Sequence, residues 1–119
     1  MARFYKDEFA CKHCGKNFIV EDFVDKLNRL GSKILFPVVI SSGYRCPEHN
    51  QKVSTTGPNG PHTTGRAADL AVRGDQAIYV LSKAFENGEF TGFGINQKGN
   101  GRFIHLDDLK EGRPTVWSY

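Results

Sequence analysis

The chain has 119 residues, a length typical of one compact domain, so we expect a single domain spanning residues 1–119. Hydrophobic residues make up 39% of it and charged residues 24%, a balance that excludes an intrinsically disordered chain. The net charge of +3 comes from Lys and Arg residues scattered along the sequence, which argues against nucleic acid as a partner.

The sequence contains no apolar run of the roughly 20 residues that a membrane span needs. Its N-terminus lacks the apolar core of a signal peptide. We therefore expect no membrane partner and a cytoplasmic location in the producing cell. We also expect a monomer.

Apolar residues recur at helical spacing from Val20, and acidic residues in the first turn favour the positive end of a helix dipole. This pattern predicts an amphipathic helix that ends near Gly31. The β-branched run at residues 37–41 is bounded by turn-forming residues and predicts a buried strand. A helical turn is expected to begin at Pro47.

Residues 54–65 are rich in Ser, Thr, Gly and Pro, which predicts an irregular surface loop. Residues 67–72 have the alternation of a strand. This alternation places Asp69 on the face opposite Leu70, so the carboxylate and the apolar core lie on different sides.

We expect Asp75 to cap a second helix that ends near Asn87. The apolar side chains expected along one side of this helix are Ile78, Leu81 and Phe85. Further strands are expected at residues 92–96, 102–107 and 115–119. The mixed order of strands and helices predicts an α+β fold with a small antiparallel sheet flanked by helices.

In residues 102–107 the alternation places His105 and Asp107 on the face opposite the core. Asp69 lies on a strand of the same kind, and His62 precedes it by seven residues in a loop that can fold back over the sheet. Two imidazoles and one carboxylate suit zinc, and three protein ligands leave a fourth position for water, as in catalytic sites. The sequence therefore predicts a zinc centre of His62, Asp69 and His105 that activates water for amide hydrolysis.

Cys11 and Cys14 have C-x-x-C spacing, and Cys46 and His49 have C-x-x-H spacing, which together suit a tetrahedral Cys3His zinc site. These four residues are candidate ligands of a second, structural zinc, and His13 is an alternative ligand. The other interpretation is three reduced cysteines that pack as small hydrophobic residues beside an unrelated histidine.

Three segments resemble the zinc D-alanyl-D-alanine peptidases of bacterial cell walls. They read SGYRCPEHN at residues 42–50, HTTGRAAD at 62–69 and FIHLD at 103–107. That family includes peptidoglycan carboxypeptidases, endopeptidases and bacteriophage lysins, and shares its fold with the hedgehog signalling domain. The resemblance covers residues 8–119 and implies a zinc-dependent hydrolase of stem or cross-link peptides. As a phage-type product it would reach the wall after release from the cell or in a phage particle.

The resemblance assigns the zinc ligands to His62, Asp69 and His105 and places Arg45 near the substrate. A guanidinium at that position would hold a carboxylate through paired, charge-assisted hydrogen bonds. In a carboxypeptidase the carboxylate would be the terminal one of a stem peptide. In an endopeptidase it would be a side-chain carboxylate, or the guanidinium would face the developing oxyanion.

One departure from the family pattern concerns the general base. Many relatives have an acid three residues, or a histidine two residues, before the last ligand, and these positions are Arg102 and Phe103 here. Asp107 is therefore our candidate catalytic residue, with orientation of a ligand imidazole as its alternative role. His49 is a further candidate acid or base.

Two other classes of function fit parts of the pattern. A zinc-containing domain that binds peptidoglycan without cutting it would explain the missing acid. A zinc-scaffolded nuclease would explain the cysteine spacing, but no element carries the cluster of Lys and Arg that phosphate binding needs. The terminal aromatic residues Trp117 and Tyr119 are predicted to pack rather than to bind a ligand.

Overall fold

The computed structural model describes residues 1–119 and confirms the α+β class. Its α-helices are α1 (Glu21–Gly31), α2 (Pro47–Val53) and α3 (Asp75–Asn87). Its strands are β1 (Val39–Ser42), β2 (Ala67–Ala71), β3 (Gly92–Asn96), β4 (Phe103–Asp107) and β5 (Thr115–Ser118). Short 3-10 helices lie at η1 (Lys6–Phe9), η2 (Gly57–Asn59) and η3 (Pro61–Thr64). No helix combines the length and the apolar content that crossing a bilayer requires.

The five strands form one sheet in the order β1-β2-β4-β3-β5. Three of the four neighbouring pairs are antiparallel, as predicted, but β3 and β5 run parallel, so the sheet is mixed. The physical reason lies in β4, whose two edges are already paired with β2 and β3. The reversing connection after β4 therefore delivers β5 to the free edge of β3, whose direction it shares.

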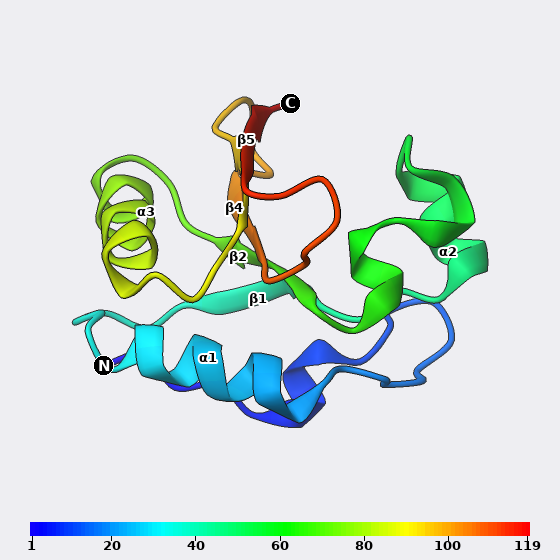
Figure 1. The fold of residues 1–119 in the computed structure, drawn as a ribbon, viewed down its shortest axis with the longest axis horizontal. Helices are drawn as coiled ribbons and strands as arrows, with labels where there is room; N and C mark the ends of the chain where they lie inside the picture. Colours follow the sequence, from blue (N-terminus) through cyan, green and yellow to red (C-terminus); the bar gives the residue numbers. More distant parts are fainter.

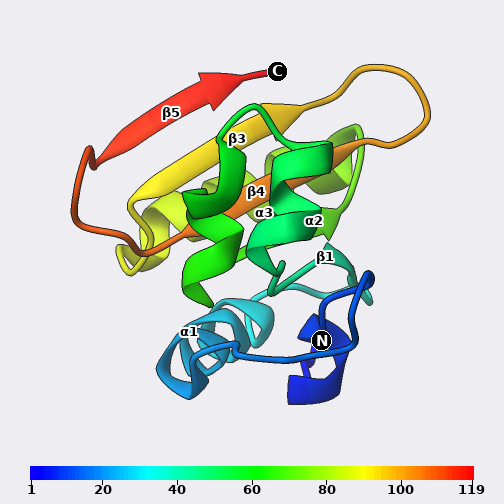
Figure 2. The same cartoon turned by 90° about the vertical axis from the view of Figure 1, so that its right-hand side faces the viewer.

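The helices lie on different sides of this sheet. Figure 1 shows α3 on one side of the strands and α2 on the other, and Figure 2 shows the same arrangement with α2 in front and α3 behind. In both views α1 runs below the β1 end of the sheet. The α2 side carries the candidate site, while the α3 side carries the apolar residues of β2 and β4.

The core is one cluster of 21 buried hydrophobic residues. The predicted stripe of α1 is confirmed, because its Phe23, Val24, Leu27 and Leu30 are all buried in this cluster. The inward side chains of β4 are Ile104 and Leu106, as the alternation predicts. Burial of these apolar groups supplies the main driving force for holding the sheet against α1.

The buried face of α3 consists of small residues. Its buried residues are Ala77, Val80 and Ala84. Ile78 and Phe85, which were predicted to lie along one side of the helix, are 71% and 53% exposed. Small side chains let the helix approach the sheet closely, so the larger ones remain at the margin, where the ring of Phe85 packs 4.4 Å from that of Phe93.

The predicted cap at Asp75 is wrong. The N-cap residue is Gly74, which has φ 61°, and no side chain caps the start of the helix through a hydrogen bond. A positive φ favours glycine. Asp75 is instead the first residue of α3, where its charge still faces the positive end of the helix dipole.

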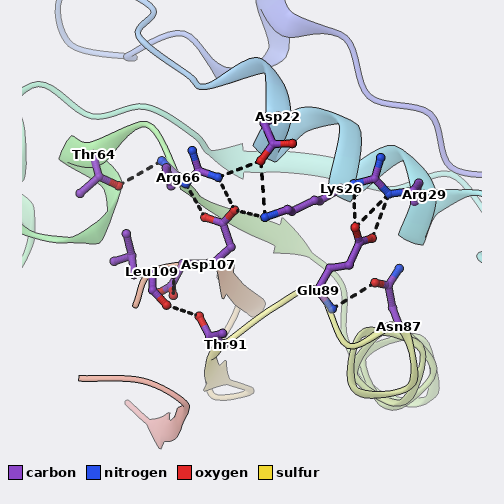
Figure 3. A network of polar contacts seen from close by, with 11 residues as sticks. Asp22, Lys26, Arg29, Thr64, Arg66, Asn87, Glu89, Thr91, Asp107 and Leu109 are labelled. Carbon is purple, nitrogen blue, oxygen red and sulfur yellow. Dashed lines mark hydrogen bonds and ion pairs between the residues drawn. The ribbon is translucent and has the colours of Figure 1, made fainter. Parts of the chain in front are cut away.

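A buried carboxylate fixes the C-terminal end of β4. Asp108 accepts hydrogen bonds from Lys26 of α1 at 2.8 Å and from the Arg66 guanidinium at 2.6 and 2.8 Å. Arg66 also contacts Asp22 of α1 at 3.0 Å. Figure 3 shows Asp22, Lys26 and Arg66 directed toward one another. Because a buried carboxylate needs such partners, the network ties β4 and the start of β2 to α1.

Candidate metal centre

Asp69 of β2 and His105 of β4 lie directly opposite each other in neighbouring antiparallel strands. Cross-strand partners project to the same face of a sheet, so the two side chains meet. The Nδ1 atom of His105 lies 3.0 Å from Oδ1 of Asp69. Both residues are buried, which shields the pair from bulk water.

His62 reaches the same carboxylate from η3, within the segment predicted to be an irregular loop. Its Nε2 atom lies 3.2 Å from Oδ1 of Asp69, and its Nδ1 atom lies 2.9 Å from the carbonyl oxygen of Gly43. A proton on Nδ1 that is donated to Gly43 leaves the Nε2 lone pair facing Asp69. Gly65 ends η3 at φ 75°, and a side chain there would collide with the backbone of Phe18. Glycine is thus required where the chain turns into β2.

The three side chains fit a zinc ion. One donor atom from each of His62, Asp69 and His105 lies within 4.8 Å of the other two. The Nε2 atom of His105 lies 2.8 Å from Oδ2 of Asp107, so a proton on Nε2 leaves the Nδ1 lone pair free for a metal. Two imidazole nitrogens and one carboxylate oxygen form the ligand set of a zinc site with an open fourth position.

The pKa values in this cluster reflect its buried opposite charges. Burial alone would raise the pKa of the Asp69 carboxyl, but its interactions with the imidazoles of His62 and His105 hold it well below its usual range. Burial alone would lower the pKa of His105, but hydrogen bonds to Asp107 and Asp69 raise it. An anionic carboxylate between two imidazoles is an environment that attracts a cation.

Asp107 lies behind His105, away from Asp69, and both of its oxygens are engaged. Besides His105, it accepts hydrogen bonds from the Arg113 guanidinium at 2.9 and 2.8 Å and from the backbone N–H of Leu109 at 3.3 Å. Burial alone would raise the pKa of Asp107, but hydrogen bonds from His105 and Arg113 lower it to about 2. Gly92 lies opposite on β3, and a Cβ at that position would collide with the carboxylate.

Arg45, the predicted substrate residue, lies beside the cluster just after β1. Its Nη2 atom lies 3.9 Å from Oδ2 of Asp69. Its guanidinium donates hydrogen bonds to Asn50 at 2.8 Å and to Ser42 at 2.9 Å, and its backbone N–H donates to the carbonyl of His62 at 3.1 Å. These contacts hold the cation next to the candidate metal ligands.

The aromatic ring of Trp117 in β5 covers one side of His105. The two ring centroids are 5.0 Å apart, and the Arg113 guanidinium lies 5.1 Å from the indole. Trp117 pairs with Gly94 of β3, where a Cβ would approach the indole within 2.8 Å. Sequence reasoning missed Arg113, Gly92 and Gly94. The two glycines at alternate strand positions were the available signal, since glycine within a strand often marks a close approach.

Tyr119 packs at the start of β4, the strand that carries His105. Burial raises the pKa of its phenol, and the charge of Asp69 adds to the rise. Its ring packs 5.1 Å from that of Phe103 at the start of β4.

The three cysteines of the second predicted cluster also lie close together. The sulfur atoms of Cys11, Cys14 and Cys46 lie within 4.8 Å of one another, and all three thiols are free. Burial alone would raise the pKa of Cys11, but hydrogen bonds from backbone N–H groups lower it to about 7. Of the two candidate histidines, His13 has Nδ1 3.5 Å from the sulfur of Cys46, whereas the ring of His49 stacks on that of His13.

Comparison with known proteins identifies the family of this chain. Searches of curated proteins and of solved structures gave no match. The family model described as Peptidase M15 matches residues 2–107, a stretch that contains both candidate metal clusters and Arg45. The chain therefore belongs to the peptidase M15 family.

Proposed function

We propose that this chain is a zinc-dependent peptidase that hydrolyses a peptide bond in the stem or cross-link peptides of bacterial peptidoglycan. Membership of the peptidase M15 family supports both the peptidase class and the dependence on zinc. The observation that carries the proposal is the convergence of His62, Asp69 and His105 on one buried point. The reaction is either that of a D-Ala-D-Ala carboxypeptidase or that of an endopeptidase.

In this proposal His62 holds zinc through Nε2, Asp69 through a carboxylate oxygen and His105 through Nδ1. When bound, zinc lowers the pKa of a water ligand from about 15.7 towards 7 and polarises the substrate carbonyl. Gly43 and Asp107 each bind the second nitrogen of one imidazole, so the donor nitrogens are oriented before metal loading. Asp69 contributes the one negative charge of the ligand set.

Asp107 acts in this scheme through His105, as a positioning residue. Its carboxylate is fully buried, and both oxygens already accept hydrogen bonds. A general base must reach a proton on the attacking water, and these contacts direct Asp107 to the far side of the imidazole instead. His49 stacks on His13 beside the cysteine cluster, which favours a role there over one in proton transfer.

Arg45 is the proposed substrate-binding residue. Its guanidinium is anchored by Asn50 and Ser42, and Nη2, the nitrogen that donates to Ser42, also lies 3.9 Å from the Asp69 carboxylate. An anchored guanidinium has lost most of its rotamer freedom, so it binds a carboxylate at a lower entropic cost than a mobile side chain. A stem-peptide carboxylate placed on Arg45 would bring a neighbouring amide toward the metal ligands.

Arg45→Lys is expected to raise the KM for peptide substrates about 10- to 100-fold, because Lys lacks the planar pair of donors. The zinc content should stay unchanged, since Arg45 is not among the proposed ligands. Steady-state kinetics and elemental analysis of the same preparation test both statements. The matched control is Arg73→Lys at an exposed position, and an equal KM in both variants would remove Arg45 from the substrate site.

The proposed setting is the bacterial cell wall. The resemblance to phage lysins supports action after release from the producing cell or as part of a phage particle. The modest positive charge would raise the encounter rate with an anionic wall polymer. We propose that the chain acts there as a monomer, with neither nucleic acid nor a membrane as partner.

Digestion of purified peptidoglycan tests the proposed function. The zinc-loaded protein is expected to release new amino groups, and mass analysis of the muropeptides identifies the bond. Loss of a terminal alanine from stem peptides indicates a carboxypeptidase, whereas conversion of cross-linked dimers to monomers indicates an endopeptidase. Equal cleavage by a His105→Ala variant, or no cleavage by the zinc-loaded protein, would contradict the proposal.

A second candidate function is peptidoglycan binding without hydrolysis. The complete engagement of Asp107 favours it, because a carboxylate that is free to act as a base is a common requirement of zinc peptidases. Sedimentation of the zinc-loaded protein with peptidoglycan, together with no release of amino groups in the same sample, would favour binding alone.

A further inference from the structure

The cysteine cluster brings together two segments that are far apart in the sequence. Cys11 and Cys14 lie on the turn after η1, and Cys46 is the N-cap residue of α2. Their sulfur atoms lie within 4.8 Å of one another without a disulfide. In a tetrahedral zinc site the sulfur atoms lie about 3.8 Å apart, so the thiols need to close by about 1 Å or less.

The backbone around the cluster donates hydrogen bonds to sulfur. The N–H of Cys46 donates to the sulfur of Cys11 at 3.3 Å, and the N–H of His49 donates to the sulfur of Cys46 at 3.4 Å. The turn itself is held by the N–H of Gly15, which donates to the carbonyl of Cys11 at 2.8 Å. Donors aimed at sulfur stabilise thiolates, which are the form of cysteine that binds metals.

Two imidazoles lie beside the three sulfur atoms. The rings of His13 and His49 are parallel within 2° at a centroid distance of 5.3 Å. The Nδ1 atom of His13 lies 3.5 Å from the sulfur of Cys46. With Zn–S near 2.3 Å and Zn–N near 2.0 Å, a tetrahedral angle also sets the S···N separation at about 3.5 Å. The imidazole of His13 thus lies at the distance of a fourth ligand from one of the three sulfur atoms, that of Cys46.

We propose that Cys11, Cys14 and Cys46, with one imidazole of the His13–His49 pair, bind a second zinc ion that is structural. Four protein ligands close the coordination sphere, so this ion would have no open position for water and no part in hydrolysis. Three thiolates and one imidazole are a donor set that zinc accepts readily. This site is separate from the centre of His62, Asp69 and His105.

The proposed ion ties the N-terminal segment to the loop that supports the candidate active site. Tyr44 donates its backbone N–H to the carbonyl of Phe9 at 2.8 Å, and a side chain at Gly43 would collide with Phe9. Gly43 in turn holds the imidazole of His62, and Arg45 directly precedes Cys46. A metal at the cysteines would therefore fix the positions of Gly43, which orients His62, and of Arg45, the proposed substrate-binding residue.

Metal counting tests the proposal. Elemental analysis of the purified protein is expected to find two zinc ions per chain, one in a Cys11→Ser/Cys14→Ser variant and one in a His105→Ala variant. The cysteine variant should keep the catalytic zinc but show a lower melting temperature and a raised KM. One zinc in the wild type, with the same count in the cysteine variant, would overturn the proposal and leave the catalytic centre in place.

Cobalt substitution gives a second measurement that does not depend on the cysteine variants. Cobalt bound by thiolates has a sulfur-to-metal charge-transfer band in the near ultraviolet, whereas a site of nitrogen and oxygen ligands has none. The cobalt-loaded wild type should show this band, and the His105→Ala variant should retain it. A wild-type spectrum without the band would exclude thiolate ligation, whatever the folding of the cysteine variants.

Variants of the two histidines test the fourth ligand. His13→Ala/His49→Ala is expected to weaken cobalt binding at the cysteines at least about tenfold, because one of four ligands is lost. The two single variants identify which imidazole binds, through the larger loss of affinity. Unchanged affinity in the double variant would contradict ligation by an imidazole.

Discussion

The Asp69→Asn variant is expected to lose the zinc of the candidate centre and, with it, peptidase activity by at least about 1000-fold. Asp69 is the one anionic ligand, and both imidazoles are arranged around it at 3.2 and 3.0 Å. An amide of the same shape keeps the packing but presents a neutral and weaker ligand. Elemental analysis and digestion of peptidoglycan by the same preparation measure the two losses.

The matched control for this variant is Asp75→Asn, the same chemical change at an exposed carboxylate in the first turn of α3. It should retain zinc and activity, with a stability loss of no more than about 1 kcal/mol from the helix dipole. Retention of full activity by Asp69→Asn would show that the metal is held elsewhere. Thermal unfolding of both variants separates loss of metal from loss of fold.

In the metal-free protein, Arg113→Met is expected to lower the free energy of unfolding by about 3 kcal/mol, because it leaves a buried carboxylate without its cation. Asp107 is completely buried, and Arg113 donates two of the hydrogen bonds that the Asp107 carboxylate accepts. The variant should also bind the catalytic zinc about 10- to 100-fold more weakly, since Asp107 orients His105. Urea unfolding and competition with a chromophoric chelator measure these quantities.

The effect on unfolding should depend on pH in a defined direction. The pKa of Asp107 falls from 3.8 to about 2 on folding, so the stability from its ionised form is present above pH 3.8 and lost as the pH falls through about 2. The free energies of unfolding of the wild type and of Arg113→Met should therefore become equal in acid. Arg73→Met, at an exposed position, is the control. If the difference in free energy of unfolding between the wild type and Arg113→Met stays constant down to pH 2, lost packing against Trp117 explains it and a lost ion pair does not.

The three candidate ligands follow from local patterns in the sequence. The alternation in residues 67–72 and 102–107 fixes which face Asp69 and His105 occupy, and antiparallel pairing brings them opposite each other. Only the approach of His62 depends on a loop, and that loop carries glycine where φ must be positive. The three candidate ligands could therefore be predicted from the strand alternation together with the HTTGRAAD and FIHLD segments.

Other features depend on contacts between distant segments, which periodicity does not encode. The pairing of Arg113 with Asp107 needs the connection after β4 to fold back on the strand that precedes it. The parallel pairing of β5 with β3 depends on which edge of the sheet is free. The set of α3 residues that is buried depends on how closely the helix approaches the sheet. Helical spacing alone did not distinguish the small inward residues from Ile78 and Phe85 at the margin.

The two glycines of β3 bear on any attempt to engineer this chain for heat resistance. Exchanging strand glycines for valine or isoleucine is a common stabilising recipe, since β-branched residues favour extended backbone. At positions 92 and 94 the new methyl groups would occupy volume already filled by a carboxylate and an indole. A redesign protocol should therefore keep both as glycine and seek its gains on the solvent side of α3.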